Sequence, residues 1–388
     1  MEYPFSPEWL DALPEPIADI YRNLELTLLE EIADELVSLS ESDIQKIRAL
    51  RAHRIPLKQI VKAIAKATEK SERAIYRMLK EAAAQNELYY HEAMTVAQLT
   101  APEYIVNKQI VNAIIEQTAN EIGNISRSMG FWTGNRLTPA SQAFNWAVDN
   151  AIVQVDSGGI SYSEAIARAT RSLADGGLSV VQYPSGHRDA VDVAVRRAVL
   201  TGVGQLNQKY TDQSMDLLKT DLVEVSAHRG ARNIGKGFRN HESWQGKIYR
   251  WSAYPRTSKG NYLDFVTTCG LGEVQGIYGA NCRHSYHPFC EGVNRPAYTQ
   301  EDLDKLKATK FTYQGKEYDT YTATQQQRKI ERTIRKEKAR LAGATNEADK
   351  QASRAKIRRL YQEYTDFSNA AGLREQRERA NWTPPNEG

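Results

Sequence analysis

The chain has 388 residues, of which 41% are hydrophobic and 26% charged, a composition typical of a globular protein with two or three domains. Its 51 basic and 48 acidic side chains leave a net charge of +3, so the overall charge favours no particular class of partner. No apolar run approaches the roughly 20 residues of a membrane span, and the first residues lack the basic and apolar order of a signal peptide, so we expect assembly in a cytoplasm.

A helical arm with segregated charges is predicted for the first part of the chain. Ser6-Pro7-Glu8 has the residues of a helix start, and apolar residues then recur at helical spacing. Up to Asp43 the only basic side chain is Arg22, whereas basic residues dominate from Lys46 to Lys80. These two halves can pair with each other in an antiparallel arm, or the basic half can face nucleic acid or an acidic protein.

The arm and the region after it are predicted to be almost entirely helical. Short helices are expected from Ser40, around Ile60 and from Ser71, where capping residues precede apolar positions. Later, Ser161-x-x-Glu164 has the spacing of a capping box, and Gly176-Gly177 ends that helix. Further helices are expected over 141–155 and 188–208, with a break at 130–134 and a short strand or extended link at 178–183.

A change of hydrophobic period marks the start of a smaller module. Leu222–Ser226 and Gly246–Trp251 alternate as strands do, and a hairpin is expected around Gly315 before a basic helical segment, Tyr321–Phe367. We therefore predict a predominantly α-helical α+β protein. Its segments are a charge-segregated helical arm (1–98), a helical domain (99–220), a small Gly/Cys/His-rich α+β module (221–298) and a charged helical C-terminal segment (299–388).

The module contains all three cysteines and four of the seven histidines of the chain. Thiolates and imidazoles are the ligands of structural zinc sites. The candidate ligands are Cys269, Cys282, His284 and Cys290, with His228, His241 or His287 as alternates. Their spacing lacks the paired C-x2-C or H-x3-H steps of well-defined zinc motifs, so buried thiols and hydrogen-bonded histidines remain the structural alternative. Zn²⁺ is the only cofactor that the sequence indicates.

Catalytic chemistry is a weaker interpretation of the same residues. Ser226, His228 and His241 are candidates for a nucleophile and a general base, and Arg229 and Arg232 would suit a phosphate. No catalytic motif fixes their geometry, so we predict no enzyme. The alternative is a metal-assisted nuclease or nucleic-acid-processing enzyme centred on His228 and His241.

Several motifs of the module are distinctive: Val225-Ser-Ala-His228-Arg-Gly-Ala-Arg232, His241-Glu-Ser-Trp244-Gln-Gly246 and Gly279-x-Asn281-Cys282-Arg283-His284, preceded by upstream segments such as Gly159–Ile166. In these segments the chain resembles the phage minor capsid protein 2 family, which is related to the Mu F-like head morphogenesis proteins. The resemblance covers the chain to about Gly292. The structural motif residues that it marks are Ser226, His228, Arg232, His241, Trp244, Gly246, Asn281 and Arg283.

This resemblance implies a minor structural protein of a tailed phage head, present in few copies at the portal vertex of the virion and assembled in the host cytoplasm. Expected partners are the portal protein and the major capsid protein or scaffold, with double-stranded DNA as a further candidate in packaging or ejection. A DNA-binding packaging factor that uses the basic helices is a third interpretation. Residues expected to contact nucleic acid or a partner are Arg51, Arg54, Lys58, Lys62, Arg328, Arg332, Arg335 and Arg358.

Overall fold

The computed structural model describes residues 5–39, 58–156, 160–181, 188–279, 282–307 and 309–380. It is a predominantly helical α+β protein, which confirms the predicted fold class. The chain forms two compact units, each assembled from separate stretches: unit 1 comprises residues 1–14, 74–121 and 197–325, and unit 2 comprises 15–73, 122–196 and 326–388. The division into four consecutive segments stays a prediction. Within the described ranges, no helix is both long and apolar enough to cross a membrane.

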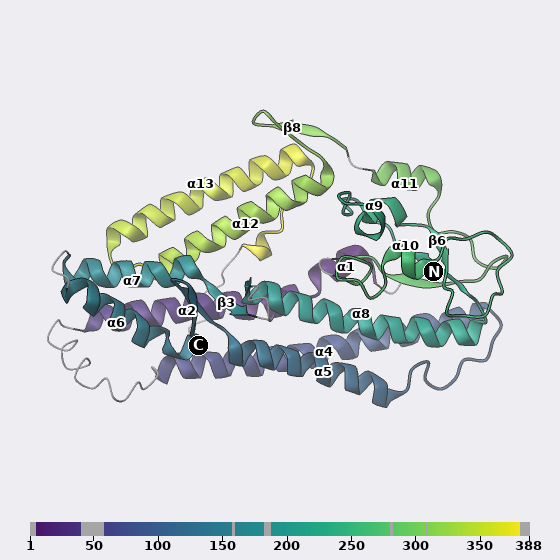
Figure 1. The fold of residues 1–388 in the computed structure, drawn as a ribbon, viewed down its shortest axis with the longest axis horizontal. Helices are drawn as coiled ribbons and strands as arrows, with labels where there is room; N and C mark the ends of the chain where they lie inside the picture. Colours follow the sequence, from purple (N-terminus) through teal and green to yellow (C-terminus); the bar gives the residue numbers. More distant parts are fainter. Residues whose placement is uncertain are drawn as a thin grey trace. The chain divides into compact units, whose positions relative to one another are not determined.

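Figure 1 labels most of the helices and some of the strands. The helices are α1 (Pro7–Ala12), α2 (Glu15–Ser38), α4 (Lys58–Val96), α5 (Lys108–Ser128), α6 (Ala143–Asp156), α7 (Tyr162–Gly176), α8 (Val191–Leu218), α9 (His241–Trp244), α10 (Phe265–Cys269), α11 (Gln300–Leu306), α12 (Thr320–Ala342) and α13 (Glu347–Ala371). The strands are β1 (Gly130–Thr133), β2 (Arg136–Pro139), β3 (Leu178–Val181), β4 (Arg188–Ala190), β5 (Leu222–Val225), β6 (Ile248–Arg250), β7 (Tyr286–Phe289), β8 (Phe311–Tyr313) and β9 (Lys316–Tyr318).

Several helix ends form where the capping residues predict them. The Ser6 side chain accepts a hydrogen bond from the Trp9 amide at 3.1 Å and begins α1. Ser161 accepts one from the Glu164 amide at 3.3 Å and begins α7. That helix ends at Gly177, whose φ of 69° lies in the left-handed region that glycine adopts without strain.

The predicted helix boundary at Ser71 is wrong. Residues 58–96 form one continuous helix, α4, and Ser71 lies inside it. Its hydroxyl donates to the Thr68 carbonyl at 2.8 Å and lies 3.0 Å from the Tyr21 hydroxyl, so it serves a buried polar contact rather than a helix cap. The helix predicted from Ser40 lies outside the described residues.

Unit 2 contains an antiparallel sheet with the strand order β2-β1-β3-β4. The sequence predicts β3, but it reads 130–134 only as a break, whereas β1 and β2 form a hairpin there. Gly130 opens this hairpin because the strands approach closely: a Cβ at this position would lie 2.2 Å from the Thr138 carbonyl oxygen. Gly130, which in the sequence indicates a break, is therefore needed for the two strands to pair.

A network of charged side chains is buried in unit 2. The guanidinium of Arg22 lies 2.8 Å from Glu15, 2.7 Å from Asp19 and 3.3 Å from Asp192, and its side chain is only 10% exposed. Burial alone would raise the pKa of Asp192, but the charges of Arg335 and Arg22 hold it below its ordinary value. The carboxylate therefore stays ionised, and the network links α2 to the start of α8.

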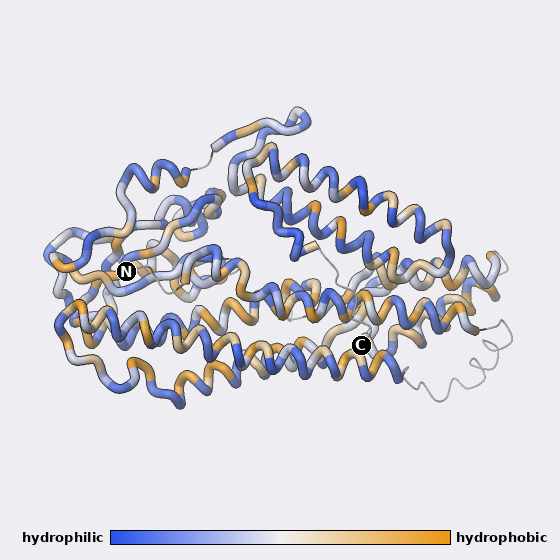
Figure 2. Tube along the Cα trace, turned by 180° about the vertical axis from the view of Figure 1, so that it is seen from behind, coloured by the Kyte–Doolittle hydropathy of each residue, from blue (hydrophilic) through white to orange (hydrophobic). Residues whose placement is uncertain are grey.

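The helices α12 and α13 lie side by side and antiparallel (Figure 1). Seen from behind in Figure 2, most of their residues are hydrophilic, with single hydrophobic positions at intervals. Many of the basic residues have acidic partners in unit 2: Arg340 lies 2.6 Å from Asp175, and Lys356 lies 2.9 Å from Glu337. Several positive charges of this hairpin are therefore compensated by carboxylates within unit 2.

Replacing Glu25 by glutamine is expected to stabilise unit 2 at neutral and alkaline pH. The Glu25 carboxylate accepts a hydrogen bond from the Leu178 amide at 3.0 Å, and burial raises its pKa from 4.5 to about 7. Between these values the folded chain holds a proton that the unfolded chain releases, so the folded state loses stability as the pH rises, and the loss is complete above about pH 7. Glutamine keeps the acceptor without the charge.

Urea unfolding measures this effect. We expect Glu25→Gln to gain about 2 kcal/mol at pH 8, and the gain to vanish near pH 4. The matched control is Glu72→Gln on the exposed side of α4, which should change stability little at either pH. A gain at pH 8 that persists unchanged at pH 4 would contradict the electrostatic explanation.

Unit 1 contains a second antiparallel sheet with the order β6-β5-β7, and a separate hairpin of β8 and β9. The sequence predicts β5, β6 and the hairpin around Gly315, whose φ of 77° the turn requires. It does not predict β7, the edge strand that pairs with β5. This three-stranded sheet is the frame of the Cys/His-rich module.

Candidate functional site

Ser226 joins the central strand of the module to the segment that contains Cys282 and His284. Its amide donates to the Ser285 carbonyl at 2.8 Å, and its hydroxyl accepts from the Ser285 amide at 2.9 Å. These contacts add one residue pair to the pairing of β5 with β7. Because Ser226 is 1% exposed and its hydroxyl is occupied, the structure favours a positioning role for it over that of a nucleophile.

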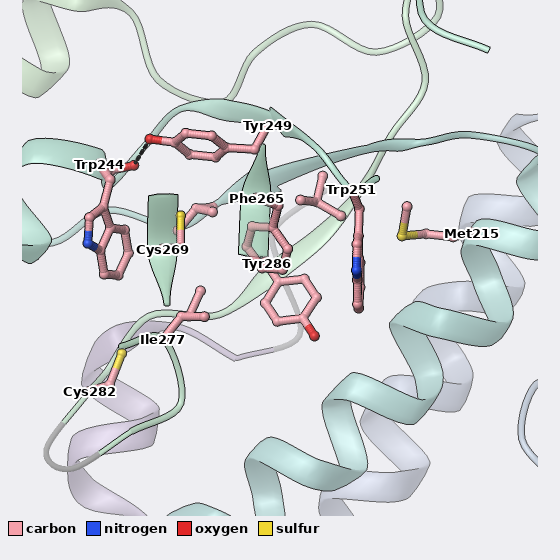
Figure 3. Close-up of a cluster of buried hydrophobic side chains, with 11 residues drawn as sticks. Met215, Trp244, Tyr249, Trp251, Phe265, Cys269, Ile277, Cys282 and Tyr286 are labelled. Carbon is pink, nitrogen blue, oxygen red and sulfur yellow. Dashed lines mark hydrogen bonds between the residues drawn. The ribbon is translucent and has the colours of Figure 1, made fainter. Parts of the chain in front are cut away.

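An aromatic core underlies the module, and Figure 3 shows its side chains. The Tyr249 hydroxyl donates to the Trp244 carbonyl at 2.7 Å, and the Trp244 indole donates to the Phe238 carbonyl at 2.9 Å. Cys269 and Cys282 belong to the same buried cluster. Burial raises the pKa of the Cys269 thiol, so this cysteine is a protonated core residue.

A glycine-rich turn follows α10 and brings a backbone carbonyl to the histidines. The helix ends at Gly270, with a φ of 68°, and the Ile277 amide then donates to the Cys269 carbonyl at 2.8 Å. Gly276 passes so close to Gly270 that a Cβ would lie 1.9 Å from its carbonyl oxygen. The turn places the carbonyl of Gln275 2.8 Å from Nε2 of His241.

Three candidate metal ligands converge in this module. One donor atom from each of His241, Cys282 and His284 lies within 4.8 Å of the others. The three residues are 3%, 6% and 1% exposed. Cys282 Sγ lies 3.5 Å from His284 Nδ1. We call these three residues the HCH cluster.

Gln245 orients the HCH cluster, and the sequence carries no signal that would have identified it. Its side-chain oxygen accepts from the backbone amide of His228 and from Nε2 of His284, each at 3.0 Å. Since a carbonyl oxygen can only accept, Nε2 of His284 bears the proton and Nδ1 keeps its lone pair. The Gln275 carbonyl fixes His241 in the same tautomer.

Burial keeps the histidines of the module neutral. It lowers the pKa of His241 to about 4 and, together with the charge of Arg283, lowers that of His228 to about 3. The pKa of His284 also lies well below its usual range because of burial and its neighbour His228, whose ring centroid is 4.4 Å away. Burial raises the pKa of Cys282 to about 11. Neutral rings are the form that binds metal, but they are poor proton donors at neutral pH.

The structure brings together two of the four predicted metal ligands. Cys282 and His284 meet the alternate His241, while Cys269 and Cys290 do not belong to this group. Cys290 is partly exposed. The alternate His287 is fully buried and has its own contacts, at 3.4 Å to the Tyr90 hydroxyl and 3.3 Å to the Ser285 hydroxyl.

The other motif residues hold the module together. Arg232 donates to the Gln275 carbonyl at 3.3 Å, and Arg283 lies 3.7 Å from the carboxylate of Asp11. Gly246 has a φ of 65°, which disfavours any side chain, and an added Cβ would lie 2.3 Å from the end of the Leu303 side chain. Asn281 lies outside the described residues.

The predicted partner-contact residues lie in several places. Lys58 and Lys62 are exposed on α4. Arg332 and Arg358 are exposed and Arg328 is partly exposed, whereas Arg335 lies 3.5 Å from Asp192 in the buried network of unit 2. Arg51 and Arg54 lie outside the described residues.

Comparison with known proteins identifies the family. A family model described as phage minor capsid protein 2 matches residues 5–369, which include the module, α12 and all but the last two residues of α13. This match extends well beyond Gly292, where the resemblance of the sequence motifs ends. Neither the curated proteins nor the solved structures include a match. The chain belongs to the phage minor capsid protein 2 family, and this membership supports a structural role in the phage head.

Proposed function

We propose that this chain is a minor structural protein that acts at the portal vertex during assembly of a tailed-phage head. Family membership supports the structural role. The place and the stage of action rest on what the sequence motifs imply, namely that this family is related to the Mu F-like head morphogenesis proteins. Its partners would be the portal protein and the neighbouring major capsid protein or scaffold.

A row of exposed basic side chains on α4 is the observation that carries this proposal. Lys58, Lys62, Lys66 and Lys70 are all exposed and follow one another at intervals of four residues. Residues four apart lie on the same face of a helix, and this row is roughly 18 Å long at a rise of 1.5 Å per residue. We call it the lysine row. Such a surface favours an acidic partner and would orient its approach.

The C-terminal hairpin contributes less to this surface than its composition indicates. Arg335, Arg340 and Lys356 have carboxylate partners within unit 2. Their charge is therefore largely compensated within the fold. The lysine row is the better candidate for contact with an acidic protein, and double-stranded DNA is the competing occupant.

The alternative of a metal-assisted nuclease centred on His228 and His241 has less support. Both rings are buried, and burial lowers their pKa to about 3 and about 4. Neither side chain is in the state that a general acid needs at neutral pH. Metal-dependent cleavage that His241→Ala abolishes would nevertheless establish this activity.

Quantitative mass spectrometry of purified proheads and mature particles tests the proposed function. The wild-type chain is expected in a fixed ratio to the portal protein in both. Reversing the lysine row with Lys58→Glu, Lys62→Glu and Lys66→Glu should lower that ratio roughly tenfold, the effect of losing about 1.4 kcal/mol of binding free energy. The control reverses three other exposed lysines, Lys305, Lys307 and Lys310, and should keep the wild-type ratio.

The outcomes separate the interpretations. Absence of the wild-type chain from both particles would overturn the structural role. Equal incorporation of both triple variants would overturn the part assigned to the lysine row. If that result came with loss of salt-sensitive DNA binding in the lysine-row variant alone, the row would be assigned to DNA instead.

A further inference from the structure

We propose that His241, Cys282 and His284, the HCH cluster, bind a zinc ion through one sulfur and two imidazole nitrogens. The site would lie inside the module rather than on its surface, since all three side chains are buried. Its role would be to stabilise the module, whereas the lysine row on α4 would bind a partner.

The separations within the HCH cluster are close to those of a zinc site. Zinc bonds of about 2.3 Å to sulfur and 2.0–2.1 Å to nitrogen place two tetrahedral ligands roughly 3.3–3.6 Å apart. Cys282 Sγ and His284 Nδ1, 3.5 Å apart, already have this separation. The widest separation in the cluster, up to 4.8 Å, would need to close by roughly 1 Å.

The hydrogen bonds of the two histidines match those of zinc-bound histidine. A histidine that binds a metal through one ring nitrogen usually donates its other N–H to a carbonyl or carboxylate. His284 donates from Nε2 to Gln245, and His241 donates from Nε2 to the Gln275 carbonyl. Each histidine thus keeps Nδ1 as the nitrogen that can bind the ion. Gln245 is itself held by the amide of His228.

The donor set selects the kind of metal. One thiolate and two imidazoles suit zinc, whereas calcium and magnesium require oxygen ligands. Three protein donors leave one tetrahedral position for a further ligand. His228, whose ring centroid lies 4.4 Å from that of His284, is a candidate for this position.

A metal would serve a clear purpose in this module, because its elements are short. The helix α9 has four residues and α10 has five, and β6 has three. Such elements bury little surface of their own, and small modules commonly depend on a metal to hold them together. The ion would fix the start of α9 to the segment that leads into β7. Trp244 packs against the His241 and His284 rings, with centroids 4.6 and 4.8 Å away.

The competing explanation is a metal-free hydrogen bond from the Cys282 thiol to Nδ1 of His284. The two explanations differ in metal content. We would produce the full chain with zinc in the medium, purify it without chelators and measure zinc by inductively coupled plasma mass spectrometry. We expect about one zinc ion per chain in the wild type and in Cys290→Ser, the control at a thiol outside the cluster, and at least a fivefold loss in Cys282→Ser and in His241→Ala.

Cobalt substitution gives a second measurement that does not depend on the folding of a variant. Adding Co²⁺ to wild-type chain stripped of zinc should produce the thiolate-to-cobalt charge-transfer absorption of one sulfur ligand, and Cys290→Ser should show it equally. A wild-type chain that holds no stoichiometric zinc and shows no such absorption would overturn the proposal. So would a folded Cys282→Ser variant that binds zinc as the wild type does.

Discussion

Arg22→Met is expected to lower the free energy of unfolding by about 3 kcal/mol. The substitution removes the cation that faces Glu15, Asp19 and Asp192, and it leaves the Glu15 and Asp192 side chains, only 10% and 13% exposed, with one cation fewer beside them. Breaking a buried ion pair from one side typically costs 3–5 kcal/mol. We expect the lower end of that range because Arg335 still lies 3.5 Å from Asp192. Urea unfolding at pH 7, followed by circular dichroism, measures the difference.

The pH dependence of this difference identifies its cause. The pKa of Asp192 is held below its ordinary value of 3.8, so the ion pair stabilises the folded state above that pH and is lost as the pH falls further. The gap between wild type and Arg22→Met should therefore narrow in acid. Arg168→Met is the matched control, because Arg168 also pairs with a carboxylate, Glu164, but is 57% exposed. It should cost at most about 0.5 kcal/mol. Equal losses for both variants would contradict the role assigned to burial.

The sequence predicts helices well wherever local chemistry alone decides their ends. The caps at Ser6 and Ser161 form as predicted, because a hydroxyl before an apolar run satisfies the first free amides of a helix. Ser71 has the same local pattern and yet does not begin a helix. Its hydroxyl binds the Thr68 carbonyl and approaches Tyr21, a residue 50 positions away. A contact at that distance along the chain leaves no trace in a local pattern.

Strands that depend on distant partners were also missed. The segment of β7 contains Pro288, a residue that is unusual in a strand, and it forms because β5 lies beside it. Pro288 is tolerated there because β7 lies at the edge of its sheet. The predominantly helical α+β class could still be predicted, because the helical spacing of apolar residues recurs in many segments of the chain.

The residues of the candidate site could likewise be predicted only in part from the sequence. The concentration of cysteine and histidine in one stretch pointed to the right part of the chain, because these residue types are rare elsewhere in it. Which of them converge could not be predicted, since His241 lies 41 positions before Cys282 and the turn between them decides the distance. The groups that orient the rings, the Gln245 side chain and the Gln275 carbonyl, were missed for a related reason. A backbone carbonyl is present at every position and carries no signature.

Gly276→Ala is expected to destabilise the module by about 3 kcal/mol or more. An added Cβ would lie 1.9 Å from the Gly270 carbonyl oxygen, and neither backbone can yield without opening the turn. Opening it would also displace the Gln275 carbonyl that accepts the hydrogen bond from His241. The variant should therefore lose thermal stability and, if the HCH cluster binds zinc, metal content as well.

Gly272 provides the control for this turn, because it lies in the same loop but has open space around it. Nothing lies within 4 Å of a Cβ there, although its φ of 89° disfavours any side chain. Gly272→Ala should cost about 1 kcal/mol from backbone strain alone and should leave the Gln275 carbonyl in place. Thermal unfolding and zinc analysis of both variants measure the difference. Similar losses in the two would show that general strain in the loop, and not the close approach of Gly276 to Gly270, limits the stability of the module.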